Sequence, residues 1–154
     1  MAGSASRDMA ATDDAVRSVR KTSTMMIESL ATLEDALRSS WGADTCDPVD
    51  LADWHPGNPA RGQCGVTVLV VNDLLGGDLV MAEVSNADGT RQGVHYWNRI
   101  GLLDIDLTRE QFTSDEHIGT GALLPRPPHA PTRCLDEYEL LRTRVLAALR
   151  SSVP

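Results

Sequence analysis

The spacing of apolar residues predicts one amphipathic helix near each end of the chain. Over Ser29–Trp41, leucines recur at helical intervals, and Gly42 follows as a typical helix stop. Over Leu135–Leu149, apolar side chains form a single stripe along one face of a helix. We therefore expect N- and C-terminal helices that flank the rest of the fold.

The apolar segment Cys64–Leu75 is compatible with two kinds of element. Its closely spaced valines favour a β-strand, whereas its length and the Gly76-Gly77 pair that follows favour a buried helix. The local pattern favours the helix only slightly, so both elements remain open at this point.

The middle of the chain carries the pattern of an antiparallel β-meander. Asp78–Ser85 predicts a strand, and Asn86–Gly89 has the composition of a hairpin turn. Gly93–Arg99 and Leu102–Thr108 predict two further strands around a tight turn at Ile100-Gly101. Together with the helices, these strands predict an α+β fold in which a small meander packs against helices.

The length of 154 residues fits one ordinary domain preceded by a short leader. Met1–Thr24 lacks an apolar run, so we expect a flexible leader or a weakly docked helix, with a single domain over residues 25–154. Ala43–Gln63 is a long irregular segment, and such segments in compact domains are usually functional or disordered. The proline-rich Ala122–Pro131 predicts an extended connector.

Charge and composition exclude several functional classes. The chain has 22 acidic and 14 basic side chains and a net charge of -8, which argues against a nucleic-acid partner. No run of 18 apolar residues is present, so we expect no membrane-spanning helix. Three cysteines, without a Cys-x-x-Cys pair, argue against a disulfide framework. With no signal peptide visible, they predict a reducing, cytoplasmic location.

The sequence also lacks the patterns of common metal and cofactor sites. Structural zinc sites use paired short spacings of cysteine and histidine, and none is present. The glycine-rich pieces match neither of the usual phosphate-binding motifs. We therefore expect no metal and no cofactor, and the candidate chemistry lies with the cysteines.

The hairpin around Ile100-Gly101 brings a histidine and a carboxylate together. With a two-residue loop, His95 pairs with Asp106, and Asp104 is its diagonal neighbour. A carboxylate beside an imidazole fixes its tautomer and stabilises the imidazolium. Without a nucleophile nearby, His95 would simply be a hydrogen-bonded sheet residue.

Cys64 is the candidate nucleophile. If the segment that it opens is a helix, the helix dipole and free N–H groups lower the pKa of the thiol. The same N–H groups would stabilise an oxyanion, and Gly62 and Gly65 would let a substrate approach. Cys46 and Cys134 lack this context, so we expect small buried residues, although Cys46 could act as a resolving thiol.

The order of a cysteine at a helix start, a histidine on a strand and an aspartate on the next strand resembles the transglutaminase-like and papain-like cysteine enzymes. More closely, a set of short motifs resembles a small bacterial YunG-like family over roughly Leu30 to Phe112. These motifs are Gly62–Thr67, Gly76-Gly77, His95–Asn98, Asp106–Thr108 and Gln111-Phe112.

The resemblance implies a papain-like or transglutaminase-like core with a catalytic triad. Cys64 would be the nucleophile, His95 the base and Asp106 the acid that orients the histidine. Papain-like enzymes often place an oxyanion-hole glutamine a few residues before the cysteine. Gln63 and Asn58 both remain candidates for that position.

The tryptophans suggest a small pocket. Trp54 and Trp97, with Asp104, are candidate pocket residues, although a place in the core is equally expected for the aromatic pair. Only 31 positions separate Cys64 from His95, so the sheet between them is small and an elaborate groove for a protein substrate is not expected.

Two functions of different class fit these residues. The first is a cysteine-dependent amide or thioester hydrolase or acyl transferase that forms a thioester intermediate. It would act on a small molecule or a chain terminus, for example in tailoring an amide metabolite. The alternative is a non-catalytic domain that binds a small ligand on the same fold, with Cys64 as packing.

Overall fold

The structure is a computed structural model that describes residues 5–152, with the side chains of residues 5–12, 23, 26 and 27 left aside. Helix α1 (Ala5–Ser40) begins well before Ser29 and ends one residue before the expected Trp41. The chain divides into two compact units after Asp35. Residues 1–4 of the predicted leader lie outside the described residues, and the rest of that segment is helical.

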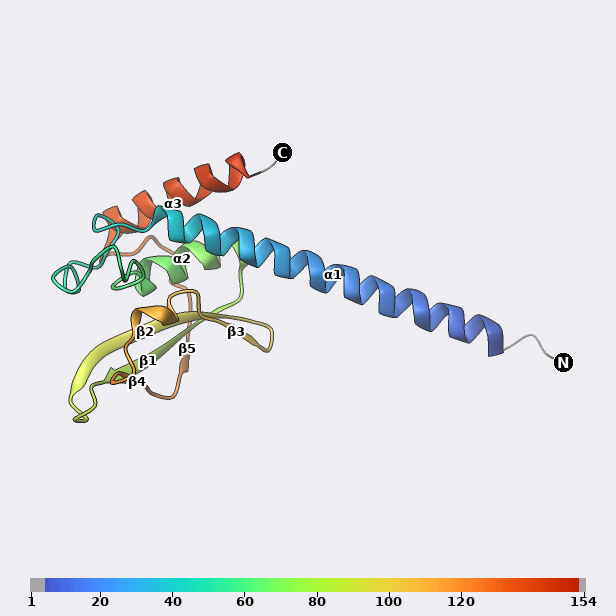
Figure 1. The fold of residues 1–154 in the computed structure, drawn as a ribbon, viewed down its shortest axis with the longest axis horizontal. Coiled ribbons are helices and arrows are strands. Elements are labelled where there is room, and N and C mark those ends of the chain that lie inside the picture. The colour runs from blue at the N-terminus through green and yellow to red at the C-terminus, as the bar shows by residue number, and fades with distance from the viewer. Residues whose placement is uncertain (1–4, 153–154) are drawn as a thin grey trace. The chain divides into compact units, whose positions relative to one another are not determined.

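The second unit, from Ala36 on, is a mixed α+β structure around a five-stranded antiparallel sheet (Figure 1). Strand β1 lies in the middle, with β2 and then β3 on one side and both β4 and β5 on the other. The strands are β1 (Asp78–Ser85), β2 (Arg91–Ile100), β3 (Leu103–Ile105), β4 (His117–Ile118) and β5 (Ala122–Leu124). The predicted α+β meander is therefore confirmed.

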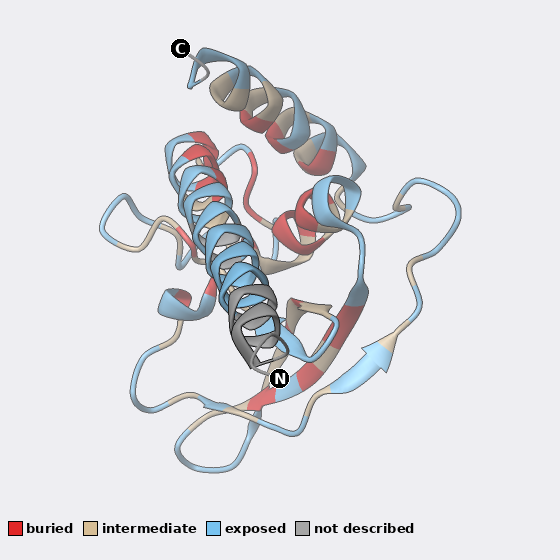
Figure 2. Cartoon of the chain, turned by 90° about the vertical axis from the view of Figure 1, so that its right-hand side faces the viewer, coloured by how far each residue is buried: buried red, intermediate tan, exposed pale blue. Residues whose placement is uncertain are grey.

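Helix α2 (Cys64–Leu75) packs between the sheet and α3 (Leu135–Ser151), and it is one of the segments with several buried residues (Figure 2). The ambiguous segment is thus a helix, because burial on two sides offsets the strand preference of its valines. Two buried hydrogen bonds fix α2 in place. Trp41 Nε1 donates to Thr67 Oγ1 at 3.0 Å, and Asn98 Nδ2 donates to the Val68 carbonyl at 2.9 Å.

The β2–β3 hairpin turns one residue later than the sequence predicted. Arg99 pairs with Asp104 rather than with Leu102, so the two turn residues are Gly101 and Leu102. Gly101 has a φ of 61°, which an L side chain adopts at a cost. Each residue of β2 therefore pairs with a residue of β3 two positions further along the chain than expected. A shift by two positions leaves every side chain on its expected face of the sheet, so His95 and Asp106 remain on one face.

The segment after residue 112 adds two short strands to the sheet, on the side of β1 away from β2. Strands β4 and β5 both pair with β1, so the first three residues of the predicted connector Ala122–Pro131 are a strand. Gly121 lies directly against the Trp97 indole, where a Cβ would clash. Trp97 therefore packs under this segment.

The irregular segment before α2 is held by side-chain hydrogen bonds and a close approach at Gly62. Gln63 is fully buried, accepts a hydrogen bond from Thr45 Oγ1 at 2.9 Å and donates to the Gly42 carbonyl at 2.9 Å. Gly62 has a φ of 68°, and a Cβ there would lie 2.5 Å from Cys46 Sγ. The backbone that leads into Cys64 is therefore fixed by packing.

Gly62→Ala is expected to destabilise the fold by about 2–4 kcal/mol, the sum of a left-handed backbone penalty and overpacking. Gly89→Ala is the matched control, because Gly89 has a φ of 82° but open space around it. It should cost only about 1–2 kcal/mol. Urea unfolding of both variants measures the difference, and equal costs would contradict the close packing at Gly62.

Candidate active site

Cys64 is the first residue of α2, and its side chain lines a cavity. The preceding residue, Gln63, makes no side-chain cap, so the N–H groups of the first turn are not satisfied by a capping side chain. The positive end of the helix dipole therefore lies at the thiol. The structure brings Cys64 to the expected place at a helix N-terminus.

His95 and Asp106 form a direct hydrogen bond. His95 Nε2 lies 2.7 Å from Asp106 Oδ2, and the His95 side chain is fully buried. A carboxylate only accepts hydrogen bonds, so Nε2 carries the proton and Nδ1 of the neutral ring has a free lone pair. The ring is also held by stacking on Trp97 and by an edge contact with Phe112, at centroid distances of 5.6 and 4.8 Å.

Gln111 links the histidine to the cysteine, a role that the sequence reasoning missed. Its Nε2 lies 3.5 Å from His95 Nδ1 and donates to the Thr108 carbonyl at 3.1 Å. The Gln111 side chain also lies close enough to the Cys64 sulfur to lower the pKa of the thiol. The available signal was the Gln111-Phe112 pair that follows Asp106–Thr108, which contributed to the resemblance but not to the site.

Among the described residues, Cys64 and His95 have no direct hydrogen bond to each other. The Gln111 side chain lies beside both of them instead, 3.5 Å from His95 Nδ1 and close enough to Cys64 to lower the pKa of its thiol. A direct proton transfer from the thiol to Nδ1 therefore requires the sulfur and the ring to come together as this amide shifts.

The thiol of Cys64 is protonated at neutral pH in this arrangement. Burial, with a smaller contribution from the negative charge of Asp50, raises the pKa of the thiol to about 11 and outweighs the lowering by Tyr96, Gln111 and Gly65. The expected lowering by the helix N-terminus is thus outweighed, because desolvation of a thiolate in an apolar cavity opposes ionisation. The predicted low pKa is wrong for this conformation.

The backbone N–H of Tyr96 reaches Cys64 because β3 is short. Ile100 and Leu103 flank a two-residue turn, so the backbone groups of Ile100 and Asn98 point toward β3. The backbone N–H and C=O of Tyr96 also point toward the β3 side. Strand β3 ends at Ile105, opposite Asn98, so it offers no partner to Tyr96. This free N–H hydrogen-bonds the Cys64 sulfur instead and lowers the pKa of the thiol.

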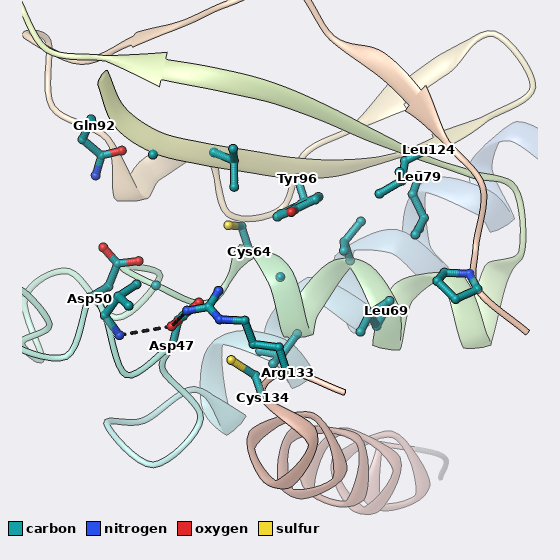
Figure 3. Close-up of a pocket in the computed structure, with 18 of the residues that line it drawn as sticks. Asp47, Asp50, Cys64, Leu69, Leu79, Gln92, Tyr96, Leu124, Arg133 and Cys134 are labelled. Carbon is teal, nitrogen blue, oxygen red and sulfur yellow. Dashed lines mark hydrogen bonds and ion pairs between the residues drawn. The ribbon is translucent and has the colours of Figure 1, made fainter. Parts of the chain in front are cut away.

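Cys64 opens into a cavity of about 360 Å³, a size typical of small-molecule sites (Figure 3). Eight of the lining residues are aliphatic, and the polar Asp50 and Gln92 lie at the end away from Leu79 and Leu124. The apolar lining side chains are Val49, Val66, Val68, Leu69, Leu79, Val94, Leu124 and Pro127, with Tyr96 beside the sulfur.

The structure corrects the predicted pocket and oxyanion residues. None of Trp54, Trp97 and Asp104 lines the cavity. Trp54 Nε1 donates to the Pro59 carbonyl at 3.2 Å, and Asp104 is exposed in an ion pair with Arg99. These side chains lie elsewhere because the cavity is on the face of the sheet that carries Tyr96 and Leu79.

The two predicted oxyanion donors also have other partners. The Gln63 amide is bound within the segment that leads to α2, as described above, and Asn58 Nδ2 donates to the Gln111 carbonyl at 2.9 Å. Asn58 therefore supports the backbone of Gln111. The polar groups that hydrogen-bond Cys64 are those of Tyr96, Gln111 and Gly65.

The other two cysteines differ from Cys64. Cys46 is buried, and its pKa is raised to about 12 by burial and by the nearby Asp50 and Asp47. Cys134 lines the cavity, and burial raises its pKa as well. Within residues 5–152, no group of histidine, cysteine and acidic side chains could hold a metal ion. No described helix is both long and apolar enough to cross a membrane.

The fold and the site define a mixed α+β protein with a helix-borne cysteine, a buried histidine paired with an aspartate, and a cavity with an apolar end. The chain belongs to the YunG protein family, whose model matches residues 29–150. It is 33% identical over 76 residues to the "Uncharacterized protein YunG" of Bacillus subtilis (strain 168). That alignment spans 49% of this chain and 56% of the relative. No solved structure matches the chain.

Proposed function

We propose that the protein is a cysteine-dependent amide or thioester hydrolase or acyl transferase, with an arrangement like that of transglutaminase-like and papain-like enzymes. The observation that carries this proposal is the His95–Asp106 hydrogen bond of 2.7 Å, in which Nε2 of His95 donates to the carboxylate while Nδ1 lies on the side of Gln111. Nδ1 contacts the Gln111 amide, and the Gln111 side chain also lies beside Cys64, which lines a cavity.

In the first half-reaction, Cys64 gives its thiol proton to His95 Nδ1 as Sγ forms a bond to the substrate carbonyl carbon. Asp106 stabilises the imidazolium that results. The carbon–nitrogen or carbon–sulfur bond of the substrate then breaks, and the leaving group takes the proton from His95. This leaves a thioester on Cys64.

In the second half-reaction, His95 takes a proton from water or from an amine, which attacks the thioester carbonyl. The carbon–sulfur bond to Cys64 breaks, and the sulfur recovers the proton. Water gives a carboxylic acid, and an amine gives a new amide. The backbone N–H groups of Tyr96 and Gly65 lie beside the sulfur, so they supply the oxyanion donors that Gln63 and Asn58 do not.

The raised pKa of Cys64 favours the second candidate function, a domain that binds a small ligand without turnover. A thiol with a pKa of about 11 is a poor nucleophile unless a base removes its proton during the reaction. The apolar cavity would hold a ligand in either case. The two functions therefore differ in whether a covalent intermediate forms on Cys64.

An acylation experiment separates the two functions. The protein is incubated with p-nitrophenyl butyrate and quenched in acid, and intact mass and peptide mapping locate the adduct. We expect one butyryl group on Cys64 and none in Cys64→Ala. His95→Gln, which keeps a polar partner for Asp106, should slow acylation at least about 100-fold. An adduct on Cys46 or Cys134 instead, or equal rates with His95→Gln, would contradict the enzyme proposal.

A further inference from the structure

The cavity beside Cys64 has an apolar end and a polar end. In Figure 3, Cys64 lies between the two, near Tyr96. The apolar end carries Leu69 of α2, Leu79 of β1 and Leu124 of β5, and the polar end carries Asp47, Asp50 and Gln92. A molecule whose carbonyl group lies at Cys64 would therefore place one part among leucines and the other among polar groups.

We propose that the apolar end takes an aliphatic acyl chain, so that the substrate is an amide or thioester of a medium-length aliphatic carboxylic acid. The reaction at Cys64 rests on the proposed function above. The binding of the aliphatic acyl chain does not rest on that function, since it depends only on the shape and the lining of the cavity.

The lining of the apolar end favours an alkyl chain over a polar group. Leucine, valine and proline side chains offer dispersion contacts but no hydrogen-bond partner, so a polar group placed there would remain unpaired. Each methylene buried in such a site strengthens binding about fourfold.

The polar end of the cavity suits the leaving group or the attacking nucleophile rather than a second aliphatic chain. Its carboxylates are already paired, since Asp47 accepts a hydrogen bond from Arg133 at 2.6 Å and Asp50 lies 3.7 Å from Arg61. A neutral polar group or water can bind among these side chains without leaving a buried charge unpaired. The direction of the acyl chain follows, with the alkyl part toward Leu124 and the leaving group toward Asp50.

Strand β5 offers a matched pair of positions for a test. Leu124 pairs with Leu79 and lines the cavity. Leu123 pairs with Val80 on the opposite face and is 58% exposed. A tryptophan at the first position fills the apolar end, whereas a tryptophan at the second points away from it.

The experiment measures the binding of octanamide and acetamide by NMR titration of the Cys64→Ser variant, which keeps the cavity but lacks the thiol. We expect octanamide to bind at least about 100-fold more tightly than acetamide. Leu124→Trp in this background should weaken octanamide binding at least tenfold, and Leu123→Trp should leave it within twofold. Thermal unfolding of both variants checks that each remains folded.

Equal binding of octanamide and acetamide would overturn the inference. This comparison needs neither tryptophan variant. A loss of octanamide binding of the same size in folded Leu123→Trp and Leu124→Trp would overturn it as well. If octanamide binds as expected but p-nitrophenyl butyrate leaves no adduct on Cys64, the proposed enzyme activity fails while the aliphatic site stands. The two proposals are thus tested separately.

Discussion

Asp106→Asn is expected to slow the acylation of Cys64 by p-nitrophenyl butyrate about 10³–10⁴-fold. The asparagine amide can donate a hydrogen bond to His95 Nε2, which would shift the ring proton to Nδ1. The nitrogen that should accept the thiol proton is then blocked, and no carboxylate remains to stabilise the imidazolium. Stopped-flow release of p-nitrophenol measures the rate.

Asp104→Asn is the matched control for this substitution. Asp104 precedes Asp106 by two positions, but it is exposed and its carboxylate pairs with Arg99, 2.9 Å from Nη2. We expect its acylation rate to stay within twofold of the wild type, because an exposed ion pair contributes little. A similar loss in both variants, or no loss in Asp106→Asn, would remove Asp106 from the mechanism.

The second large effect concerns the reaction of Cys64 with iodoacetamide, which needs the thiolate. Because burial raises the pKa of Cys64 to about 11, the rate should rise about tenfold per pH unit from pH 7 to 10 without levelling off. At pH 8 it should be at least about 100-fold below that of a free cysteine peptide. Peptide mapping by mass spectrometry follows each cysteine separately.

A charge variant tests the cause of the raised pKa. Asp50→Asn removes a negative charge that raises the pKa of Cys64, so alkylation at a given pH should become faster. Cys46 provides an internal reference, since its pKa of about 12 predicts an even slower reaction. A plateau below pH 8 in the wild type would instead mean that Cys64 is already a thiolate, paired with a protonated His95.

Slow alkylation together with fast acylation would identify where activation occurs. Iodoacetamide reports only the thiolate present before any substrate binds. An ester bound in the cavity excludes water and brings its carbonyl to the sulfur, so His95 can accept the proton in the same step. The combination would mean that the nucleophile is activated within the complex rather than in the free protein.

The amphipathic patterns predicted most of the elements but not their exact pairing. Both flanking helices and the strand β1 follow from local periodicity and glycine boundaries, whereas for α2 the local pattern left helix and strand open. The β2–β3 turn was misplaced by one residue, since Ile100-Gly101 and Gly101-Leu102 fit the local sequence equally well. The His95–Asp106 contact survived this error because the pairing shifts by two positions, which preserves the face.

The parts of the site that the sequence missed depend on contacts between distant segments. Gln111 reaches His95 and Cys64 only because the chain turns back after β3, through the short helix η1 (Arg109–Gln111). Trp54 and Trp97 were placed near the pocket on composition, which does not indicate the face of the sheet a side chain occupies. Tyr96, adjacent to Trp97, lies on the cavity face instead.

The sequence by itself determined the two flanking helices, the central meander, and a histidine and an aspartate in one hairpin, whereas burial on two sides decided that Cys64 opens a helix. The flanking helices, the meander and the hairpin follow from periodicity and spacing, which act over a few residues. Only the tertiary structure decided the cavity beside Cys64, the Gln111 contact and the raised pKa of the thiol. Each depends on burial and on long-range contacts, and desolvation outweighs the helix dipole that local reasoning expected to prevail.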